Sequence, residues 1–262
     1  MTSILDHNRD AWNRQSREGE SRWVQPVDAA TIARARQGDW QVILTPTLPV
    51  PADWFGNVRN RKVLCLASGG GQQAPVLAAA GAQVTSFDNS DEQLDKDRLV
   101  AEREGLALRL EQGDMADLTR FADNAFDLIF HPVSNVFAAD VQAVWRECHR
   151  VLKPGRRLLS GFMNPAFFLF DHEAIEAGGP MEVAFRLPFS DIEHLPEAQL
   201  QARIERQEAL EYSHSLDDQI GGQIDAGFVI AGFYEDRWSN EATPLNSFMP
   251  TSMATLAIRG DG

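Results

Sequence analysis

Three glycines between a short apolar run and an acidic residue are the residues whose types and spacing best indicate chemistry. Residues 63–66 are apolar, and a run of that length predicts a buried parallel strand. Residues 69–71 are all glycine, and glycines at a strand-to-helix turn let the backbone approach a ligand because no Cβ intervenes. Residues 84–87 are interpreted as a second strand that ends in Asp88, whose carboxylate can accept hydrogen bonds from a ribose diol. This order predicts a site for an adenosine-containing cofactor.

The glycine turn alone does not identify the cofactor, because Gly69-x-Gly71-x-x-Ala74 fits the dinucleotide fingerprint only loosely. Two further segments are more specific. Gly-Asp-Met at 113–115 follows a third apolar segment, and Val-Leu-Lys-Pro-Gly at 151–155 leads into the apolar run 158–162. With these segments, the chain resembles the class I S-adenosylmethionine-dependent methyltransferases. It is most similar to small-molecule enzymes like the ubiquinone-biosynthesis C-methyltransferases, mainly over residues 61–161.

The resemblance implies S-adenosylmethionine as cofactor, S-adenosylhomocysteine as product, and a small molecule as methyl acceptor. It implies a ribose contact for Asp88, a position beside the adenine for Asn89, and adenine contacts for Asp114 and Met115. The aminoacyl part would lie against the backbone of Ala67, Ser68, Gly69, Gly70 and Gly71.

The chain departs from this family at Cys65, where an acidic residue commonly orients the glycine loop. We therefore expect the cofactor ammonium group to be held by the carbonyl groups of Ala67 and Ser68, or by a side chain from the N-terminal region.

His131 follows a fourth apolar run, residues 126–130. The crevice of a doubly wound sheet opens at the carboxyl ends of its strands, so we expect His131 to face both cofactor and acceptor. It is our candidate catalytic residue, either as a positioning contact or as a general base. The candidate acceptor-binding residues are Trp12, Asn135, Asn164 and Phe168. The remaining histidines show no metal-ligand spacing on one helix, so we expect no metal site.

The alternation of apolar runs and helical segments predicts an α/β fold with a doubly wound, Rossmann-like sheet. The resemblance implies seven strands in the order 3-2-1-4-5-7-6, with the last strand antiparallel. We expect residues 1–60 to form an N-terminal helical cap and residues 61–262 the S-adenosylmethionine-binding domain. Residues 164–212 interrupt the alternation and are interpreted as a substrate-covering insertion, with a charged helix over 197–211.

Composition narrows the possible partners. The net charge of −14 argues against nucleic-acid and anionic membrane partners, because both need a basic surface. No apolar stretch reaches the length of a membrane span, and the sequence starts without a basic segment followed by an apolar one. The two cysteines cannot form a disulfide framework. We expect a cytoplasmic enzyme, either a monomer or a homodimer.

Two alternatives remain open at the sequence level. The first is an NAD(P)-dependent oxidoreductase on the same glycine turn, although neither Tyr212 nor Tyr234 belongs to a Tyr-x-x-x-Lys pair. The second is a non-catalytic S-adenosylmethionine-binding protein, an alternative that stays open because Cys65 replaces the family's acidic residue. The sequence names neither the acceptor nor the acceptor atom, which can be O, N, S or C.

Overall fold

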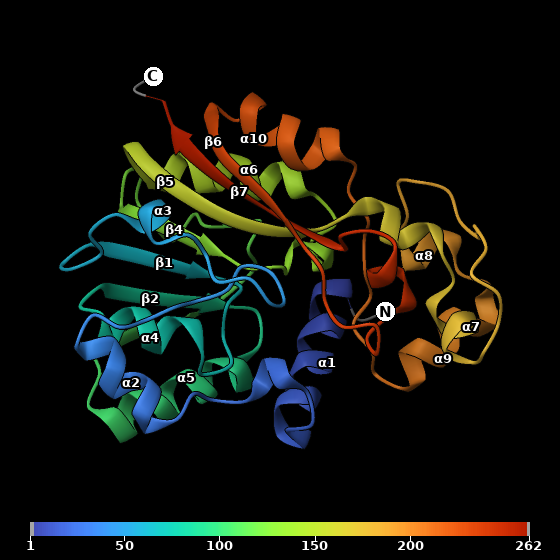
Figure 1. Cartoon of the computed structure of the whole chain (residues 1–262), viewed down its shortest axis with the longest axis horizontal. Coiled ribbons are helices and arrows are strands. Elements are labelled where there is room, and N and C mark those ends of the chain that lie inside the picture. The colour runs from blue at the N-terminus through green and yellow to red at the C-terminus, as the bar shows by residue number, and fades with distance from the viewer. Residues whose placement is uncertain (1–2, 261–262) are drawn as a thin grey trace.

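One seven-stranded sheet runs through the molecule in the order β3-β2-β1-β4-β5-β7-β6 (Figure 1). The computed structural model describes residues 3–260. This topology and the α/β class confirm the fold predicted above. The strands are β1 (Lys62–Leu66), β2 (Gln83–Asp88), β3 (Leu108–Gln112), β4 (Phe126–His131), β5 (Leu152–Met163), β6 (Phe228–Asp236) and β7 (Ser252–Arg259).

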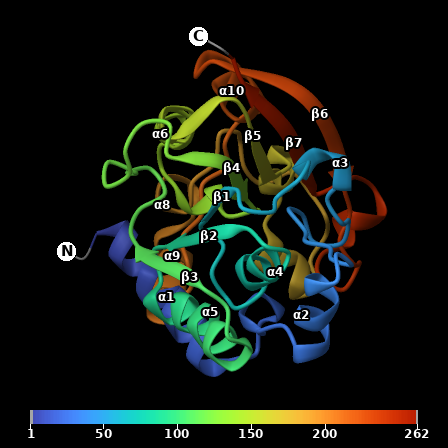
Figure 2. The ribbon, with the colours of Figure 1, turned by 90° about the vertical axis from the view of Figure 1, so that its left-hand side faces the viewer.

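The first five strands are parallel, and β7 is antiparallel to both of its neighbours. The last strand along the chain therefore lies inside the sheet, between β5 and β6. Figure 2 shows β3 and β6 at the two opposite edges. The edge strand β6 exposes Val229 and Phe233, whereas β7 is almost entirely buried.

Helices cover both faces of the sheet. Because side chains alternate along each strand, apolar side chains point to both faces and pack against these helices. Val63 and Cys65 of β1 join one apolar cluster with α2 (Ala29–Arg36) and α4 (Gln73–Ala79). Leu64 and Leu66 point the other way, into a second cluster with α6 (Val141–Val151). The helices α5 (Asp91–Glu104) and α10 (Gly222–Asp225) extend the first and second layers respectively.

The N-terminal region divides into two parts. Helix α1 (Ile4–Glu18) packs against α5, and the short helix η1 (Arg22–Val24) follows it. Asn13 holds α1 in place, because its Oδ1 accepts from Ser90 Oγ (2.6 Å) and its Nδ2 donates to Asp91 Oδ1 (2.7 Å). By contrast, α2 and the short helix α3 (Ala52–Phe55) contribute to the apolar core of the sheet. The first part lies over the ends of the strands (Figure 1), and of the second part the loop between α2 and α3 also reaches them, because the Leu44 carbonyl group accepts from Val133 N at 2.9 Å.

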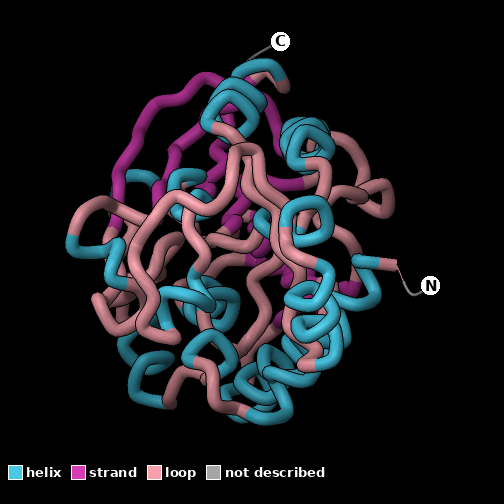
Figure 3. The backbone as a smooth tube through the Cα atoms, turned by 90° about the vertical axis from the view of Figure 1, so that its right-hand side faces the viewer, coloured by secondary structure: helices cyan, strands magenta, loops and turns pink. Residues whose placement is uncertain are grey.

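The insertion after β5 forms a lobe beside α1 at the end where the parallel strands point (Figure 1). Seen from that end, helices and loops dominate the molecule (Figure 3). A small aromatic cluster around Phe168 and Phe189 holds the lobe together. Arg203 bonds to the buried Asp191 at 3.0 Å and to Glu173 at 3.1 Å. The helical elements of the lobe are η3 (Pro165–Leu169), α7 (His172–Glu176), α8 (Asp191–His194) and α9 (Glu197–Glu205).

Two boundaries differ from the sequence-based prediction. Helix α9 ends at Glu205 instead of continuing to residue 211, because Gln207 takes a left-handed backbone conformation with φ of +52°. Strand β5 begins at Leu152, earlier than expected, because Leu152 pairs with Phe126 across a register irregularity. No helix within residues 3–260 is both long and apolar enough to cross a bilayer.

Candidate active site

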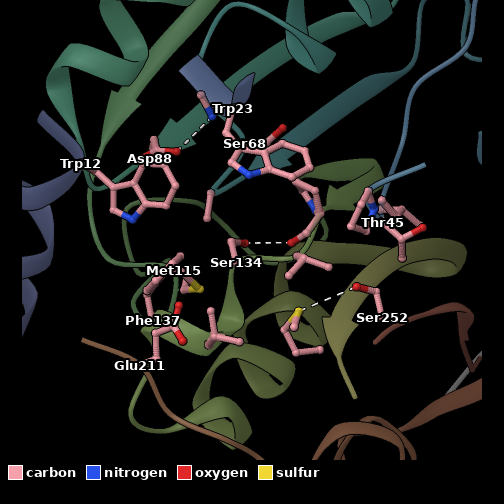
Figure 4. Close-up of a pocket in the computed structure, with 18 of the residues that line it drawn as sticks. Trp12, Trp23, Thr45, Ser68, Asp88, Met115, Ser134, Phe137, Glu211 and Ser252 are labelled. Carbon is pink, nitrogen blue, oxygen red and sulfur yellow. Dashed lines mark hydrogen bonds between the residues drawn. The ribbon is translucent and has the colours of Figure 1, made fainter. Parts of the chain in front are cut away.

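A cavity of about 360 Å³ opens at the carboxyl ends of the central strands (Figure 4). Ser68 follows β1, Asp88 ends β2, Pro132 follows β4, and Met163 ends β5. Segments that are distant in sequence close the other sides, and they come from α1, η1, the insertion and the loop before β7. The volume falls in the range of small-molecule sites.

The three glycines of the turn direct their amides into the protein. Gly69 N donates to Asp88 Oδ2 (3.0 Å), and Gly70 N donates to the Gln93 carbonyl group (2.9 Å). Gly71 N donates to Asp97 Oδ1 (2.7 Å). These amides therefore fix the turn itself. Of the three glycines, Gly69 lines the cavity, whereas Gly70 and Gly71 lie behind it.

Steric crowding explains why glycine occupies the turn. A Cβ at Gly70, where φ is +108°, would lie 2.5 Å from the Trp23 carbonyl oxygen. A Cβ at Gly69 would lie 2.7 Å from the Gln93 Cβ. The turn is thus compressed between η1 and the first turn of α5, and a larger residue would push one of them away.

Asp88 lies at the cavity with one hydrogen bond already made to each carboxylate oxygen. Oδ2 accepts from Gly69 N, and Oδ1 accepts from Ser90 N at 2.9 Å. Burial raises the pKa of Asp88 above its ordinary value, and the backbone hydrogen bonds oppose that shift. Each oxygen keeps a lone pair for a further donor, as a ribose diol requires.

The residues expected near the adenine also line the cavity. Asn89 does so while its Nδ2 donates to the Leu5 carbonyl group at 2.8 Å, which ties α1 to the end of β2. Asp114 Oδ1 accepts from Ala116 N at 2.9 Å, and the second oxygen of Asp114 remains for a ligand. Met115 lies beside them at the same end of the cavity.

Aromatic side chains from the N-terminal region stand over the cavity. Trp12 contacts Phe137 edge-on, with ring centroids 5.4 Å apart. Trp23 meets Trp238 of the loop before β7 at 5.5 Å, and the Arg22 guanidinium lies over the Trp23 ring at 4.8 Å. Figure 4 shows Trp12 and Trp23 on the Asp88 side of the cavity.

His131 does not line the cavity. It is fully buried beneath it, where Nδ1 donates to the Leu66 carbonyl group at 3.0 Å and the ring stacks edge-on against Trp145 of α6. Burial lowers the pKa of His131 to about 4, so the imidazole is neutral at neutral pH. The physical reason is strand alternation: Phe130 points to the α4 side, so His131 points to the α6 side.

Two of the four candidate acceptor residues line the cavity and two do not. Trp12 and Phe168 face it. Asn135 is buried outside it and exchanges hydrogen bonds with Gln219, at 2.8 and 3.2 Å. Asn164 caps η3 through Ala166 N, and its Nδ2 donates to the Pro250 carbonyl group. Both asparagines serve the local backbone and neighbouring side chains.

Gln93, in the first turn of α5, lines the cavity. Ser90 Oγ accepts from Gln93 N, but Ser90 N donates to Asp88 and not to the Gln93 side chain. Gln93 Oε1 is therefore buried without a partner, as is Ser68 Oγ. Buried polar atoms without partners are uncommon, so both are candidate ligand contacts.

Glu211 also lines the cavity, although the sequence-based prediction placed it at the end of a charged helix. Figure 4 shows it beside Phe137, on the side where Met115 lies. Burial, helped by the nearby charge of Asp191, raises the pKa of Glu211 to about 7. Its backbone amide donates to Asp191 Oδ2 at 2.8 Å. Nothing local marks this residue, because its position depends on how the insertion folds back.

The charged side chains that line the cavity are all acidic. Among the described residues they are Asp88, Asp114 and Glu211, and no lysine, arginine or histidine faces the cavity. Within residues 3–260, no group of His, Cys, Asp and Glu side chains has a metal-binding arrangement.

Known proteins resemble this chain in both sequence and fold. Residues 64–160 match a family model described as a methyltransferase domain. The uncharacterized methyltransferase YbaJ of Bacillus subtilis is 48% identical over 259 residues, which covers 99% of this chain and 100% of YbaJ. The chain belongs to the class I S-adenosylmethionine-dependent methyltransferases.

More distant relatives share parts of this methyltransferase. The sterol 24-C-methyltransferase erg6 of Aspergillus fumigatus is 36% identical over 107 residues, covering 40% of this chain and 28% of that protein. An S-adenosylmethionine-dependent methyltransferase from Mesorhizobium loti superposes with a TM-score of 0.61 at 17% identity. That match covers 79% of this chain and 94% of the other, and it shows the shared fold.

Proposed function

We propose that this methyltransferase transfers a methyl group from S-adenosylmethionine to a small-molecule acceptor that is not anionic. The observation that carries the proposal is one cavity whose charged side chains, among the described residues, are all carboxylates. An anionic acceptor would enter it without a counter-ion and would be repelled. A neutral or cationic acceptor meets no such penalty.

The residues at the ends of β1, β2 and β3 fit the cofactor. The free lone pairs of Asp88 suit the ribose hydroxyl groups, and Asp114 with Met115 suits the adenine. Ser68 Oγ and Gln93 Oε1 are buried polar atoms that gain partners when the aminoacyl part binds. Trp12 and Trp23 offer ring faces near a sulfonium cation, which is attracted to aromatic faces.

The acceptor would occupy the part of the cavity beyond β4. Met163, Phe167 and Phe168 give this part an apolar wall. Ser252, whose Oγ donates to Met163 Sδ at 3.7 Å, and Thr45 add polar side chains to this lining (Figure 4). Such a mixture suits a largely apolar compound with one polar group. The partial likeness to a sterol methyltransferase supports an acceptor of this general kind.

The chemistry demands little of the protein beyond alignment. When bound, the cofactor supplies an electrophilic methyl group that reacts by in-line displacement. The chain must then hold the acceptor atom in line and exclude water, which the aromatic side chains from α1 and the insertion favour. A general base is needed only where the acceptor loses a proton. Neutral His131, below the cavity floor, does not hold or move that proton in this proposal.

The test has two stages. Calorimetry first measures binding of S-adenosylhomocysteine, the product of the proposed cofactor, and of NADH, the cofactor of the oxidoreductase alternative. We expect binding of S-adenosylhomocysteine only. Formation of S-adenosylhomocysteine is then measured against matched acceptor pairs, such as amines or methyl esters and the corresponding carboxylic acids. Turnover with the anionic members alone would contradict the proposal. Binding without turnover of any compound would favour the non-catalytic alternative.

A further inference from the structure

Asp97 is a fully buried carboxylic acid on α5 that is bonded to the glycine turn. Its Oδ1 accepts from Gly71 N at 2.7 Å, and its Oδ2 accepts from Ser86 Oγ of β2 at 2.6 Å. It lies on the side of the turn away from the cavity, since neither Asp97 nor Gly71 lines that cavity. Both of its oxygens are occupied by protein donors, so it is placed to act through the turn.

The charged surroundings of Asp97 are unfavourable to an anion. The ionisable groups that face it are the Cys65 thiol from β1 and the Asp88 carboxylate from β2. No salt bridge reaches it from the described part of the chain. Burial, with a smaller contribution from Asp88, raises the pKa of Asp97 to about 7 despite its two hydrogen bonds. A buried carboxylate without a counter-ion is costly to retain.

The segment that Asp97 holds is mechanically linked to the cavity. Gly71 has φ of +75°, and a Cβ there would lie 2.9 Å from the Lys96 carbonyl oxygen and from Pro26 Cβ. The Gly71 carbonyl group accepts from Val27 N at 2.9 Å. The turn is thus clamped between α5 and the N-terminal region, and its other end carries Ser68 into the cavity wall.

We propose that Asp97 is a positioning residue of the cofactor site, which fixes the glycine turn from behind and is ionised when the cationic cofactor is bound. The small, uncharged Cys65 side chain leaves the neighbouring position on β1 without a carboxylate, and α5 supplies one instead. Two hydrogen bonds stabilise the charge of Asp97 in part, and in this proposal a cation bound in the cavity supplies the positive charge that the described part of the protein does not.

This inference rests on the proposed cofactor, and it predicts linkage between charge and binding. Both ligands carry the same aminoacyl group with its ammonium, and they differ at sulfur, where S-adenosylmethionine has a sulfonium cation and S-adenosylhomocysteine a neutral thioether. A nearby cation favours the ionised form of a carboxyl group. The preference for S-adenosylmethionine over S-adenosylhomocysteine should therefore increase as pH rises through the region in which Asp97 ionises.

The first experiment uses the protein without ligand. Because the folded-state pKa of Asp97 is raised, its contribution to stability is present at low pH and is lost as pH rises from about 4 through about 7. The difference in melting temperature between Asp97→Asn and wild type should therefore shift in favour of the variant by about 3–6 °C from pH 5 to pH 8. Asp95→Asn, an exposed change on the same helix, should follow wild type.

The second experiment measures affinities by calorimetry at pH 6 and pH 8. In wild type and Asp95→Asn, the ratio of S-adenosylmethionine to S-adenosylhomocysteine affinity should rise by about threefold or more. In Asp97→Asn the ratio should stay constant, with S-adenosylhomocysteine affinity within about threefold of wild type. Asp97→Ala, which leaves the Gly71 amide without its acceptor, should weaken S-adenosylhomocysteine binding by about tenfold.

Two results would overturn the inference. One is wild-type affinity for S-adenosylhomocysteine in folded Asp97→Ala, and the other is an affinity ratio that changes with pH equally in wild type and Asp97→Asn. If Asp97→Ala does not fold, the comparison with Asp97→Asn still decides. Wild type that binds neither ligand would contradict the proposed function instead, and the melting experiment would then test Asp97 by itself.

Discussion

The two halves of the cavity are built in different ways. The cofactor half comes mostly from one stretch, residues 67–115, to which the glycine turn, the end of β2, the start of α5 and the loop after β3 each contribute. The acceptor half comes from α1, the loop at residues 43–46, the loop after β4, the insertion and the loop before β7. Short-range sequence patterns can determine the first half, whereas only the completed tertiary fold determines the second. The two halves should therefore respond differently to substitution.

The largest effect is expected from a substitution in the cofactor half of the cavity. Asp88→Ala removes a carboxylate that accepts from Gly69 N and Ser90 N and keeps lone pairs for the ligand. Loss of charge-assisted hydrogen bonds should weaken S-adenosylhomocysteine binding by tenfold or more, measured by calorimetry. The exposed Asp95→Ala serves as control. Equal affinity in Asp88→Ala and wild type would refute the ribose assignment.

The next effect should separate the two halves. Arg203→Ala leaves the buried Asp191 without its cation, which should cost about 2 kcal/mol of stability by chemical denaturation. Because Asp191 also holds the Glu211 backbone, turnover should fall while S-adenosylhomocysteine affinity stays within about threefold. Arg206→Ala removes a more exposed arginine from the same ion-pair group and should leave stability close to that of wild type. Equal losses in both variants would show that the lobe does not depend on Asp191.

Glu211 tests the boundary between the halves, because it comes from the insertion but lies on the Met115 side of the cavity. Its folded-state pKa is raised to about 7, so its contribution to stability is lost as pH rises from about 4.5 through about 7. Glu211→Gln should therefore be more stable than wild type by roughly 1 kcal/mol at pH 8 and little different at pH 4.5. The exposed Glu205→Gln should show no such pH dependence. A pH-independent difference for Glu211→Gln would place this carboxyl group in water.

The smallest effect concerns His131. Since its ring lies under the cavity and its pKa is lowered to about 4, His131→Asn should reduce turnover by less than about tenfold. The pH–rate profile between pH 5 and pH 8 should keep its shape. A loss beyond a thousandfold, with the acidic limb abolished, would restore His131 as the general base and move the reacting centre toward β4.

The sequence predicted the elements whose information is local. The glycine turn and the strand ending in Asp88 depend on neighbouring residues, and strand order followed from the family resemblance. The direction of His131 was missed because strand alternation, together with the packing of Trp145, turns its ring away from the cavity. Asp97 and Glu211 were missed for a different reason. Each becomes a buried acid only through packing between segments that are distant in sequence, and no local pattern distinguishes it from a solvated one.

The position of β7 has a consequence for how the molecule is made. Chains emerge from the ribosome with the N-terminal end first, and domains generally fold as units. During synthesis β6 can find no place beside β5, because β7 must lie between them and appears last. Until residues 252–259 have emerged, the apolar edge of β5 stays open to other strands. We therefore expect a nascent chain that stalls before this point to carry the residues of the cofactor half together with a sheet edge that is open to pairing with other strands.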